Sequence, residues 1–246
     1  MSYIDYLDGY AYHMVHLDNL QSIFQRRALL SKRKVLQENI SYRSIAFEDV
    51  QSLRDRIYIL DVSNRKYRAL HNYVPFYFST ITPMLYVQYI NGIQEKIVFF
   101  KVSRSILKDK GVIFTDGNAT NQQLRKQGKE TVYITPITVT NPSCIRNYTR
   151  GGPFGTNQNR SDFYADPIFL DRLNWSIINS RWFLDEESTR IKHAEILYPD
   201  LLPLARLEEI IVSTRSMVDE VNSLIKEIGM AGSLPYAVCQ PKLYFS

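Results

Sequence analysis

Two neighbouring stretches decide the fold of this chain: LHNYVPFYF at residues 70–78 and TPML at residues 82–85. Aromatic and β-branched residues are typical of strands, so Tyr73–Phe78 predicts a strand. Proline cannot donate a hydrogen bond to a neighbouring strand, so Pro75 predicts a position at the start of a strand or on a sheet edge. Proline does suit the first turn of a helix, and Thr82-Pro83 therefore predicts a helix that runs to Asn91.

Strands and helices alternate on both sides of this block. The sequence predicts further strands at Tyr10–Leu17, Lys96–Val102, Val112–Thr115, Ala194–Tyr198, Ile210–Ser213, Tyr236–Val238 and Leu243–Phe245. It predicts helices at Asn19–Arg27 with Asp18 as N-cap, at the end of Arg43–Arg56, at Phe163–Phe183, and at Met217–Ile228, where Gly229 closes the helix. This interspersed order favours an α+β fold with a mixed or antiparallel sheet over a doubly wound parallel one. No internal repeat or low-complexity linker divides the chain, so we expect a single domain over residues 1–246.

The composition is that of a globular protein. Of the 246 residues 45% are apolar and 22% are charged, which supports a core and excludes wholesale disorder. The longest apolar runs fall far short of the roughly 20 residues that span a bilayer. The N-terminus carries no basic segment followed by an apolar run, and two cysteines make no disulfide framework. We therefore expect a cytoplasmic protein that does not contact membranes.

Aromatic and basic residues are the compositional signal for a partner. The chain has 17 Tyr and 12 Phe, a net charge of +5, and eleven basic against five acidic residues between Arg26 and Arg68. Single-stranded nucleic acid is bound by this combination, because phosphates attract Lys and Arg while bases stack on aromatic rings. The alternative is that the rings fill a β-rich core and the charges are solvated. Composition leaves both interpretations open.

Several common chemistries lack their motifs. The chain has no GxGxxG, no Walker loop, no GxSxG and no HExxH. His13 and His16 stand three apart on a predicted strand and so face opposite sides of it, which argues against a shared metal ion. Ile196 and Leu197 follow Glu195, where a metal-dependent nuclease would carry a lysine after one intervening residue. We expect no metal site.

Glu195 is the residue that stands out without reference to any family. It lies in the apolar strand Ala194–Tyr198, where an ionised carboxylate costs several kcal/mol unless it is paired or faces a cleft. The alternative is that Glu195 occupies the solvent face of an edge strand. Arg54 and Arg56 are ambiguous in the same way, since a surface role is the default for an arginine.

Blocks spread over almost the whole chain resemble the DarT family of DNA ADP-ribosyltransferase toxins. They are YHMVHLDNL at 12–20, LHNYVPFYF at 70–78 with TPML at 82–85, FTDGNA at 114–119, LNW at 173–175, HAEIL at 193–197 and YFS at 244–246. The resemblance implies a single-domain ADP-ribosyltransferase fold with mixed or antiparallel central sheets flanked by helices. The segment at about 120–162 is longer and more polar than in compact members of the family.

The resemblance also implies NAD as co-substrate and assigns site residues. The family's catalytic glutamate falls on Glu195, and its catalytic arginine, which precedes the VPFYF block, falls on Arg54 with Arg56 as the alternate. The residues that the resemblance implies for NAD binding are His13, Met14, Val15, Asn19, Arg54, Tyr77 and Phe78. For Tyr77 and Phe78, packing within a core strand is the open alternative.

The substrate that the resemblance implies is a base in single-stranded DNA. A base in a duplex does not present its pairing edge, so the acceptor should be unpaired or flipped out. We expect thymine as the acceptor, with guanine as the alternative, and the expected DNA contacts are Arg146, Arg150, Asn159, Arg160 and Tyr164. The resemblance further implies a toxin neutralised by an antitoxin of the DarG or ADP-ribosyl-hydrolase kind, and we separately expect a monomer. Transfer to RNA or protein, or nucleic-acid binding without catalysis, are the competing hypotheses.

Overall fold

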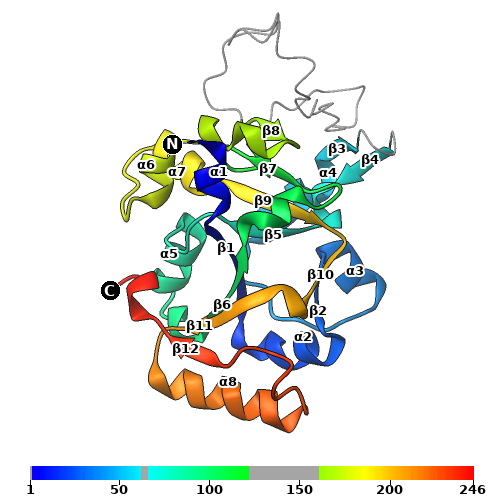
Figure 1. Cartoon of the computed structure of the whole chain (residues 1–246), viewed down its shortest axis with the longest axis vertical. Coiled ribbons are helices and arrows are strands. Elements are labelled where there is room, and N and C mark those ends of the chain that lie inside the picture. Colours follow the sequence, from blue (N-terminus) through cyan, green and yellow to red (C-terminus); the bar gives the residue numbers. More distant parts are fainter. Residues whose placement is uncertain (1, 62–65, 122–160) are drawn as a thin grey trace, which may run out of the picture.

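The computed structural model describes residues 2–61, 66–121 and 161–246, and in them one large sheet carries the fold (Figure 1). The sheet has eight strands in the order β12-β11-β6-β1-β5-β9-β7-β8. Their bounds, in that order, are Ala237–Cys239, Leu207–Val212, Ile97–Ser103, Tyr10–His16, Tyr73–Tyr77, Glu195–Pro199, Ile113–Thr115 and Phe163–Tyr164. The pairs are antiparallel except for β11 with β12, which is parallel. The expected α+β class with a mixed sheet is confirmed.

The sheet divides into two halves between β1 and β5. β1 pairs with β6 from Tyr10↔Ser103 to His16↔Ile97, but with β5 it pairs only at Tyr12↔Tyr77. β5 in turn pairs with β9 from Tyr73↔Pro199 to Tyr77↔Glu195. Because directly opposed residues on paired strands project to the same face, Tyr77 and Glu195 lie side by side next to the division.

Pro75 occupies an inner strand, so the expected start or edge position is wrong. It is the third residue of β5 and lies opposite Leu197 of β9. The nitrogen and the carbonyl of one strand residue point to the same side, and the Pro75 carbonyl accepts a hydrogen bond from His13 on β1 at 2.7 Å. The missing N–H therefore points toward β1, where no backbone ladder forms at this position. Proline is tolerated because the division of the sheet removes the need for a donor.

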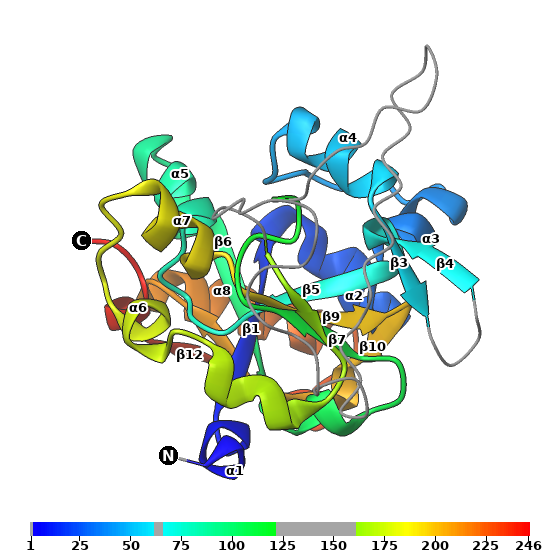
Figure 2. The same ribbon diagram turned by 90° about the horizontal axis from the view of Figure 1, so that it is seen from above.

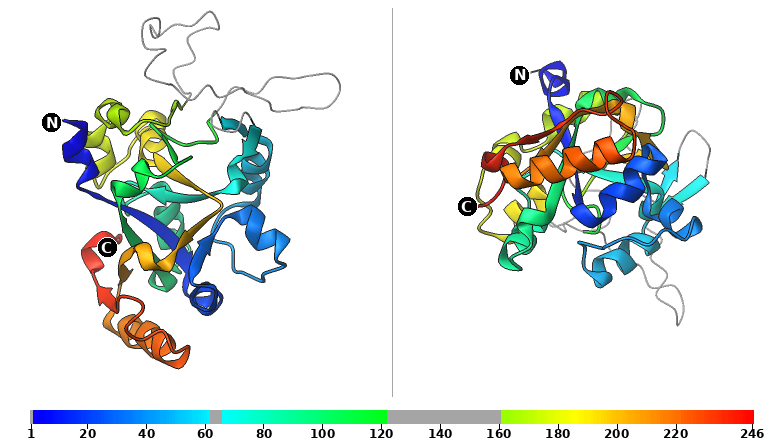
Figure 3. Two further views of the ribbon diagram at one scale, coloured as in Figure 1. Left: turned by 45° about the vertical axis from the view of Figure 1, so that its right-hand side comes forward. Right: turned by 90° about the horizontal axis from the view of Figure 1, so that it is seen from below.

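Helices surround the sheet. They are α1 (Tyr3–Leu7), α2 (Leu20–Arg26), α3 (Lys32–Gln37), α4 (Glu48–Arg56), α5 (Pro83–Ile90), α6 (Trp175–Asn179), α7 (Glu186–Lys192) and α8 (Arg215–Glu227). Seen from above, α3 and α4 lie on one side of the sheet and α5, α6 and α7 on the other, while from below α8 crosses the sheet end formed by β11 and β12 (Figures 2 and 3). Two small antiparallel pairs complete the described fold, β2 (Ala28–Leu30) with β10 (Leu201–Pro203) and β3 (Tyr58–Asp61) with β4 (Lys66–Ala69).

Two of the predicted helices have the expected ends. Thr82 caps α5, since its hydroxyl accepts a hydrogen bond from the N–H of Leu85. The α8 helix buries Met217, Val221 and Ile225 along one face, and Gly229 follows its end at a φ of +72°. Glycine adopts this left-handed conformation without the steric cost of a Cβ, which explains where the helix stops.

One predicted cap and two predicted elements are wrong. Asp18 does not cap α2, because it lies within a 3₁₀ turn (Leu17–Asn19) and its carboxylate binds Arg43. Phe163–Phe183 is not one helix: it holds strand β8, a 3₁₀ segment (Pro167–Arg172) and the short α6. Residues 243–245 form no strand, because Pro241 begins another 3₁₀ turn. In each case a side-chain contact or a proline overrides the local periodicity.

The core fixes the strand that carries Glu195. Ile196 and Leu197 are both 0% exposed and lie in different hydrophobic clusters, one on each face of the sheet. No helix among the described residues is long and apolar enough to cross a membrane.

Candidate active site

Glu195 is buried at the start of β9, between β5 and β7. It is 2% exposed, so it is neither on an edge strand nor on a solvent face. Its backbone N–H donates to the Thr115 hydroxyl at 3.2 Å, and that hydroxyl donates to the Gly117 carbonyl at 2.6 Å. The carboxylate therefore starts from a backbone that both the sheet and a side chain hold in place.

Arg54 is the partner of this carboxylate. Its Nη1 donates to Oε1 of Glu195 at 2.8 Å and its Nη2 donates to Oε2 at 3.2 Å, a bidentate pair between residues 141 positions apart. Burial acts against the Arg54 charge, but the adjacent Glu195 outweighs it and raises the pKa of Arg54. Arg56 is exposed at the end of α4. The structure thus brings Arg54, and not Arg56, to Glu195.

His71 ties α4 to the sheet behind this pair. It lies in the 3₁₀ turn Leu70–Asn72 before β5, is 6% exposed, and contacts Gln51 through Nε2 at 3.1 Å and Asp55 through Nδ1 at 3.3 Å. Asp55 also pairs with Arg33 at 2.7 Å. Gln51 and Asp55 flank Arg54 on α4, so these contacts set the rotation of the helix and the direction of the guanidinium.

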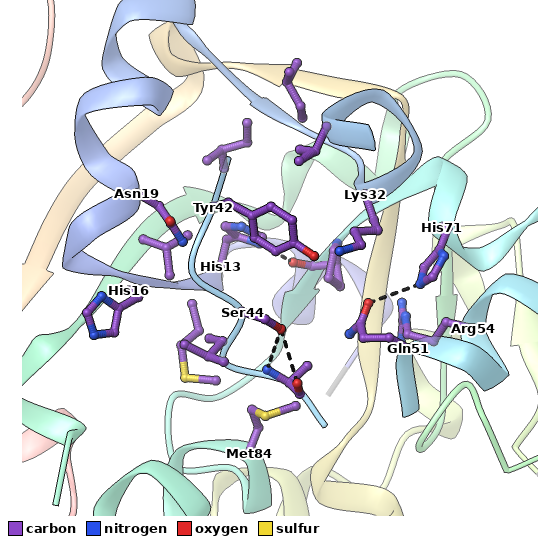
Figure 4. A pocket seen from close by; sticks show the side chains of 18 of the residues that line it. His13, His16, Asn19, Lys32, Tyr42, Ser44, Gln51, Arg54, His71 and Met84 are labelled. Atoms are coloured by element: carbon purple, nitrogen blue, oxygen red, sulfur yellow. Dashed lines mark hydrogen bonds between the residues drawn. The ribbon is translucent and has the colours of Figure 1, made fainter. Parts of the chain in front are cut away.

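A cavity of about 440 Å³ opens over the Arg54–Glu195 pair. Its size falls within the usual range for small-molecule sites. Of the residues expected to bind NAD or act on it, those that line the cavity are His13, Met14, Val15, Asn19, Arg54, Tyr77 and Glu195. Figure 4 shows His13, Arg54, Gln51 and His71 around this cavity, together with Lys32 from the start of α3 and Tyr42 from the segment between α3 and α4. The structure therefore brings residues of the sequence blocks at 12–20, 70–78 and 193–197 together in one site.

His13 presents one free ring nitrogen to this cavity. A carbonyl can only accept, so the 2.7 Å contact with Pro75 places the proton on Nδ1 and leaves the lone pair on Nε2. Burial lowers the pKa of His13 to about 4, while the Pro75 hydrogen bond acts in the opposite direction. The ring is neutral at pH 7, and its Nε2 is a hydrogen-bond acceptor.

Tyr77 and Phe78 lie in different environments. Tyr77 lines the cavity opposite Glu195, and burial followed by the Glu195 charge raises its pKa. Phe78 is 2% exposed and packs edge-on against Phe114 and Trp175. Phe78 does not line the cavity, so its expected place on nicotinamide is not supported and the core alternative describes it.

The expected DNA contacts are largely outside the described residues. Arg146, Arg150, Asn159 and Arg160 lie there. Tyr164 is described: it is 4% exposed, stacks on Phe114 and contacts Phe169. A ring buried in this way does not present a face to a DNA base, so the structure places Tyr164 in the core and not on a substrate surface.

Sequence reasoning missed three residues of the site. Gln51 and His71 were not singled out because their contact joins segments whose proximity depends on the fold. His193 also lines the cavity, with its ring 6.5 Å from that of Tyr77. Alternation along a strand could not have found His193, because it ends α7 at a ψ of 9° and lies before β9 begins. Among residues 2–61, 66–121 and 161–246, no three His, Cys, Asp or Glu side chains form a group that could hold a metal ion.

Comparison with known proteins identifies the family. The family model described as "ssDNA thymidine ADP-ribosyltransferase, DarT" matches residues 12–141 and 154–245. The chain belongs to the DarT family. This confirms the resemblance drawn from the sequence blocks, and with it the expected enzyme class, an NAD-dependent DNA ADP-ribosyltransferase.

Relatives and solved structures of the DarT family agree with this assignment. A DNA ADP-ribosyl transferase of Thermus sp. (strain 2.9) is 27% identical over 224 residues, which cover 88% of this chain and 87% of that protein. A fusion of a DNA ADP-ribosyl transferase with a DNA ADP-ribosyl glycohydrolase from Thermosipho africanus is 26% identical over 113 residues, 46% of this chain and 28% of the fusion.

The solved structures confirm the fold. Thermus sp. 2.9 DarT in complex with ADP-ribosylated ssDNA superposes with a TM-score of 0.72 at 24% identity, over 97% of each chain. The same protein in complex with NAD+ gives a TM-score of 0.70, over 97% of this chain and 98% of the other.

Proposed function

We propose that this chain transfers ADP-ribose from NAD to thymine in single-stranded DNA. The observation that carries the proposal is the bidentate Arg54–Glu195 pair at the base of a cavity that His13 and Tyr77 also line. The thymidine description of the family model, and the NAD+ and ssDNA complexes of the Thermus relative, support the choice of donor and acceptor.

The residues of the cavity fit the donor. NAD supplies an ADP-ribosyl group joined to nicotinamide as its leaving group. Arg54 offers a permanently charged, planar guanidinium, which suits phosphate or a base carbonyl. The His13 Nε2 accepts a hydrogen bond from a ribose hydroxyl or the nicotinamide amide. Met14 and Val15 present backbone groups from β1, and Asn19 marks the other end of the cavity.

Glu195 carries the chemical step in this proposal. Cleavage of a glycosidic bond develops positive charge at the sugar, and a fixed carboxylate stabilises charge that exists only in the transition state. The position of Glu195 in an inner strand means that little reorganisation is needed when that charge forms. Arg54 holds the carboxylate in one orientation, through two hydrogen bonds, before the donor is in place.

The biological role extends this proposal. ADP-ribose on a pairing edge blocks template reading, so the enzyme acts as a toxin. Its antitoxin is a DarG-like ADP-ribosyl hydrolase, and the Thermosipho fusion of transferase with glycohydrolase supports that pairing. We propose a cytoplasmic monomer, in which one chain supplies the complete Arg54–Glu195 site.

Intact-mass measurement tests the acceptor. The protein is incubated with NAD and single-stranded oligonucleotides that differ at one base. A gain of one ADP-ribose unit only on the thymine oligonucleotide is expected. A gain on guanine alone corrects the acceptor, and no gain on any oligonucleotide rejects transfer to DNA. A matched RNA oligonucleotide separates DNA from RNA transfer.

A further inference from the structure

A segment without secondary structure forms one wall of the cavity. We call it the strap and define it as residues 40–47, between α3 and α4. All of its residues except Ser41 line the cavity, and none of them is buried. Among the described residues, no backbone–backbone hydrogen bond reaches residues 41–46. Segments with few buried contacts and unpaired backbone groups are those that open most easily in a native protein.

Asn19 holds the strap at one point. The N–H of Arg43 donates to Oδ1 of Asn19 at 2.7 Å, and Nδ2 of Asn19 donates to the Arg43 carbonyl at 2.9 Å. One side-chain amide thus pairs with both backbone groups of a strap residue, as a neighbouring strand would. Asn19 stands at the start of α2 but makes no capping hydrogen bond to it. The amide that the resemblance assigns to NAD is therefore already engaged with the strap.

Gln88 holds the strap at a second point. It lies on α5, is 2% exposed, and its Nε2 donates to the Ile45 carbonyl at 2.9 Å. A buried amide is costly unless it is hydrogen-bonded, so this contact favours one position of the strap. Met84 and Val87 of the same helix line the cavity, but Gln88 does not. Gln88 can therefore affect a bound donor only through the strap.

The position of the strap matters to both sides of the site. Tyr42 and Ser44 of the strap are among the cavity residues in Figure 4, and Nζ of Lys32 lies 3.9 Å from the centroid of the Tyr42 ring. At the end of the strap, Phe47 is the N-cap of α4, the helix that carries Arg54. The strap therefore supplies a wall of the cavity and leads directly into the helix of the catalytic arginine.

We propose that Asn19 and Gln88 are positioning residues that hold the strap against the cavity and thereby set the affinity for the ADP-ribosyl donor. This inference rests on NAD as the donor in the proposed function. The strap exchanges between a closed state, which completes the cavity, and an open state, which holds about a quarter of the free molecules. The donor binds the closed state, so its apparent affinity is reduced in proportion to the closed fraction. A saturating donor closes the strap in every molecule, so the two residues should affect KM and not kcat.

The first test uses Gln88→Met, because methionine fills a similar volume in the buried site but has no N–H to donate. The loss of one hydrogen bond shifts the strap equilibrium by about 10-fold, so the Kd for NAD, measured by calorimetry without DNA, should rise about 3-fold. The kcat at saturating NAD should stay within about 2-fold of wild type. Gln94→Met is the matched control and should bind NAD as wild type does. Gln94 also donates from Nε2 to a backbone carbonyl at 2.9 Å, but that carbonyl belongs to Phe245 and not to the strap.

The second variant separates positioning from direct contact. Asn19→Ala removes two hydrogen bonds to the strap and should raise the Kd for NAD by about 10-fold. A direct contact between Asn19 and NAD predicts weaker binding in Asn19→Ala but wild-type binding in Gln88→Met. That pattern would overturn the proposal, as would a fall in kcat with an unchanged Kd. If the wild type binds no NAD, the proposed function itself is wrong; if it binds NAD and both variants match it, only the positioning assignment is wrong.

Another readout needs neither turnover nor the donor. The Arg43 amide proton is bound by Asn19 and not by Gln88. Its exchange for deuterium, followed by NMR, should nonetheless be about 3-fold faster in Gln88→Met than in wild type, because both side chains hold the same segment closed. Exchange at the wild-type rate in Gln88→Met would show that Gln88 acts only on its own contact, and it would contradict the proposal.

Discussion

The two members of the catalytic pair are held by different parts of the molecule. Glu195 lies in an inner strand of the sheet and is 2% exposed, and its N–H binds Thr115 across the ladder. Arg54 lies on α4, a helix with no buried residue. Contacts of His71 with Gln51 and Asp55 tie this helix to the sheet. The carboxylate is thus placed by the core, whereas the guanidinium depends on a few side chains near the surface. On the sheet side, meaning the strands around Glu195, substitutions should change the activity little. On the α4 side, meaning Arg54 and the contacts that hold its helix, substitutions should change the activity by graded amounts.

The largest effect should come from the sheet side. Glu195→Gln keeps the shape and a hydrogen bond to Arg54 but removes the negative charge, so transfer should fall by about 100- to 1,000-fold, as for other preorganised transition-state contacts. Nicotinamide release in the presence of single-stranded DNA measures this. Glu208→Gln, at an exposed position on β11, is the matched control and should behave as wild type. Near-normal activity of Glu195→Gln would remove Glu195 from the catalytic role.

The next effect tests the α4 side. Arg54→Lys replaces a bidentate pair with a point charge, and the loss of one charge-assisted hydrogen bond predicts about a 10- to 100-fold lower rate. Arg56→Lys changes the same residue type two positions along the helix, at an exposed site, and should stay close to wild type. Equal losses in the two variants would show that α4 as a whole, and not the Arg54 contact, matters. Steady-state rates at saturating NAD decide this.

The attachment of α4 should depend on pH through His71. Burial, and then the Arg54 charge, lowers the pKa of His71 to about 4, against about 6.5 for an unfolded histidine. The unfolded chain therefore binds more protons below pH 6.5, and stability is lost as the pH falls toward 4, at up to about 1.4 kcal/mol per pH unit. Urea unfolding from pH 4 to 7 should show a shallower slope for His71→Gln than for wild type. Parallel curves would contradict a neutral, buried His71.

The smallest effect should follow a change beside Glu195. Thr115→Val leaves the Glu195 N–H without its hydroxyl partner and should lower the free energy of unfolding by about 1–3 kcal/mol. Its rate should fall less than that of Arg54→Lys, because β9 is still paired with β5 along its length. Thr115→Ser keeps the hydroxyl and serves as the control. A rate loss larger than that of Arg54→Lys would mean that the core does not place the carboxylate as described.

Much of the sheet side could be predicted from the sequence. Short apolar runs predicted β6 and β9, and a lone acid within β9 marked Glu195 before any family was considered. The pattern failed where side chains make long-range contacts. Phe163–Tyr164 pairs with β7 and does not enter a helix, and the Tyr244 hydroxyl binds the carbonyls of Ile97 and Ile211, which draws the C-terminus into the core.

The α4 side could be predicted only through the resemblance. The short helix α4 is only partly buried and carries no periodic signal that points to Arg54, and spacing alone could not separate Arg54 from Arg56. His71 and Gln51 were missed because their contact exists only in the folded chain, and His193 was missed because only the fold brings the end of α7 to the cavity. Local sequence patterns locate groups that the core holds in place. Residues that contact one another across the fold are found only from the structure.

The balance of products tests the central claim most directly. Wild-type protein is incubated with NAD and a single-stranded oligonucleotide that contains one thymine, and both released nicotinamide and oligonucleotide mass are measured. The account predicts one ADP-ribose gained for each nicotinamide released, with both lost in Glu195→Gln. Nicotinamide release without a gain in oligonucleotide mass would show that water is the acceptor and would contradict a DNA-modifying site.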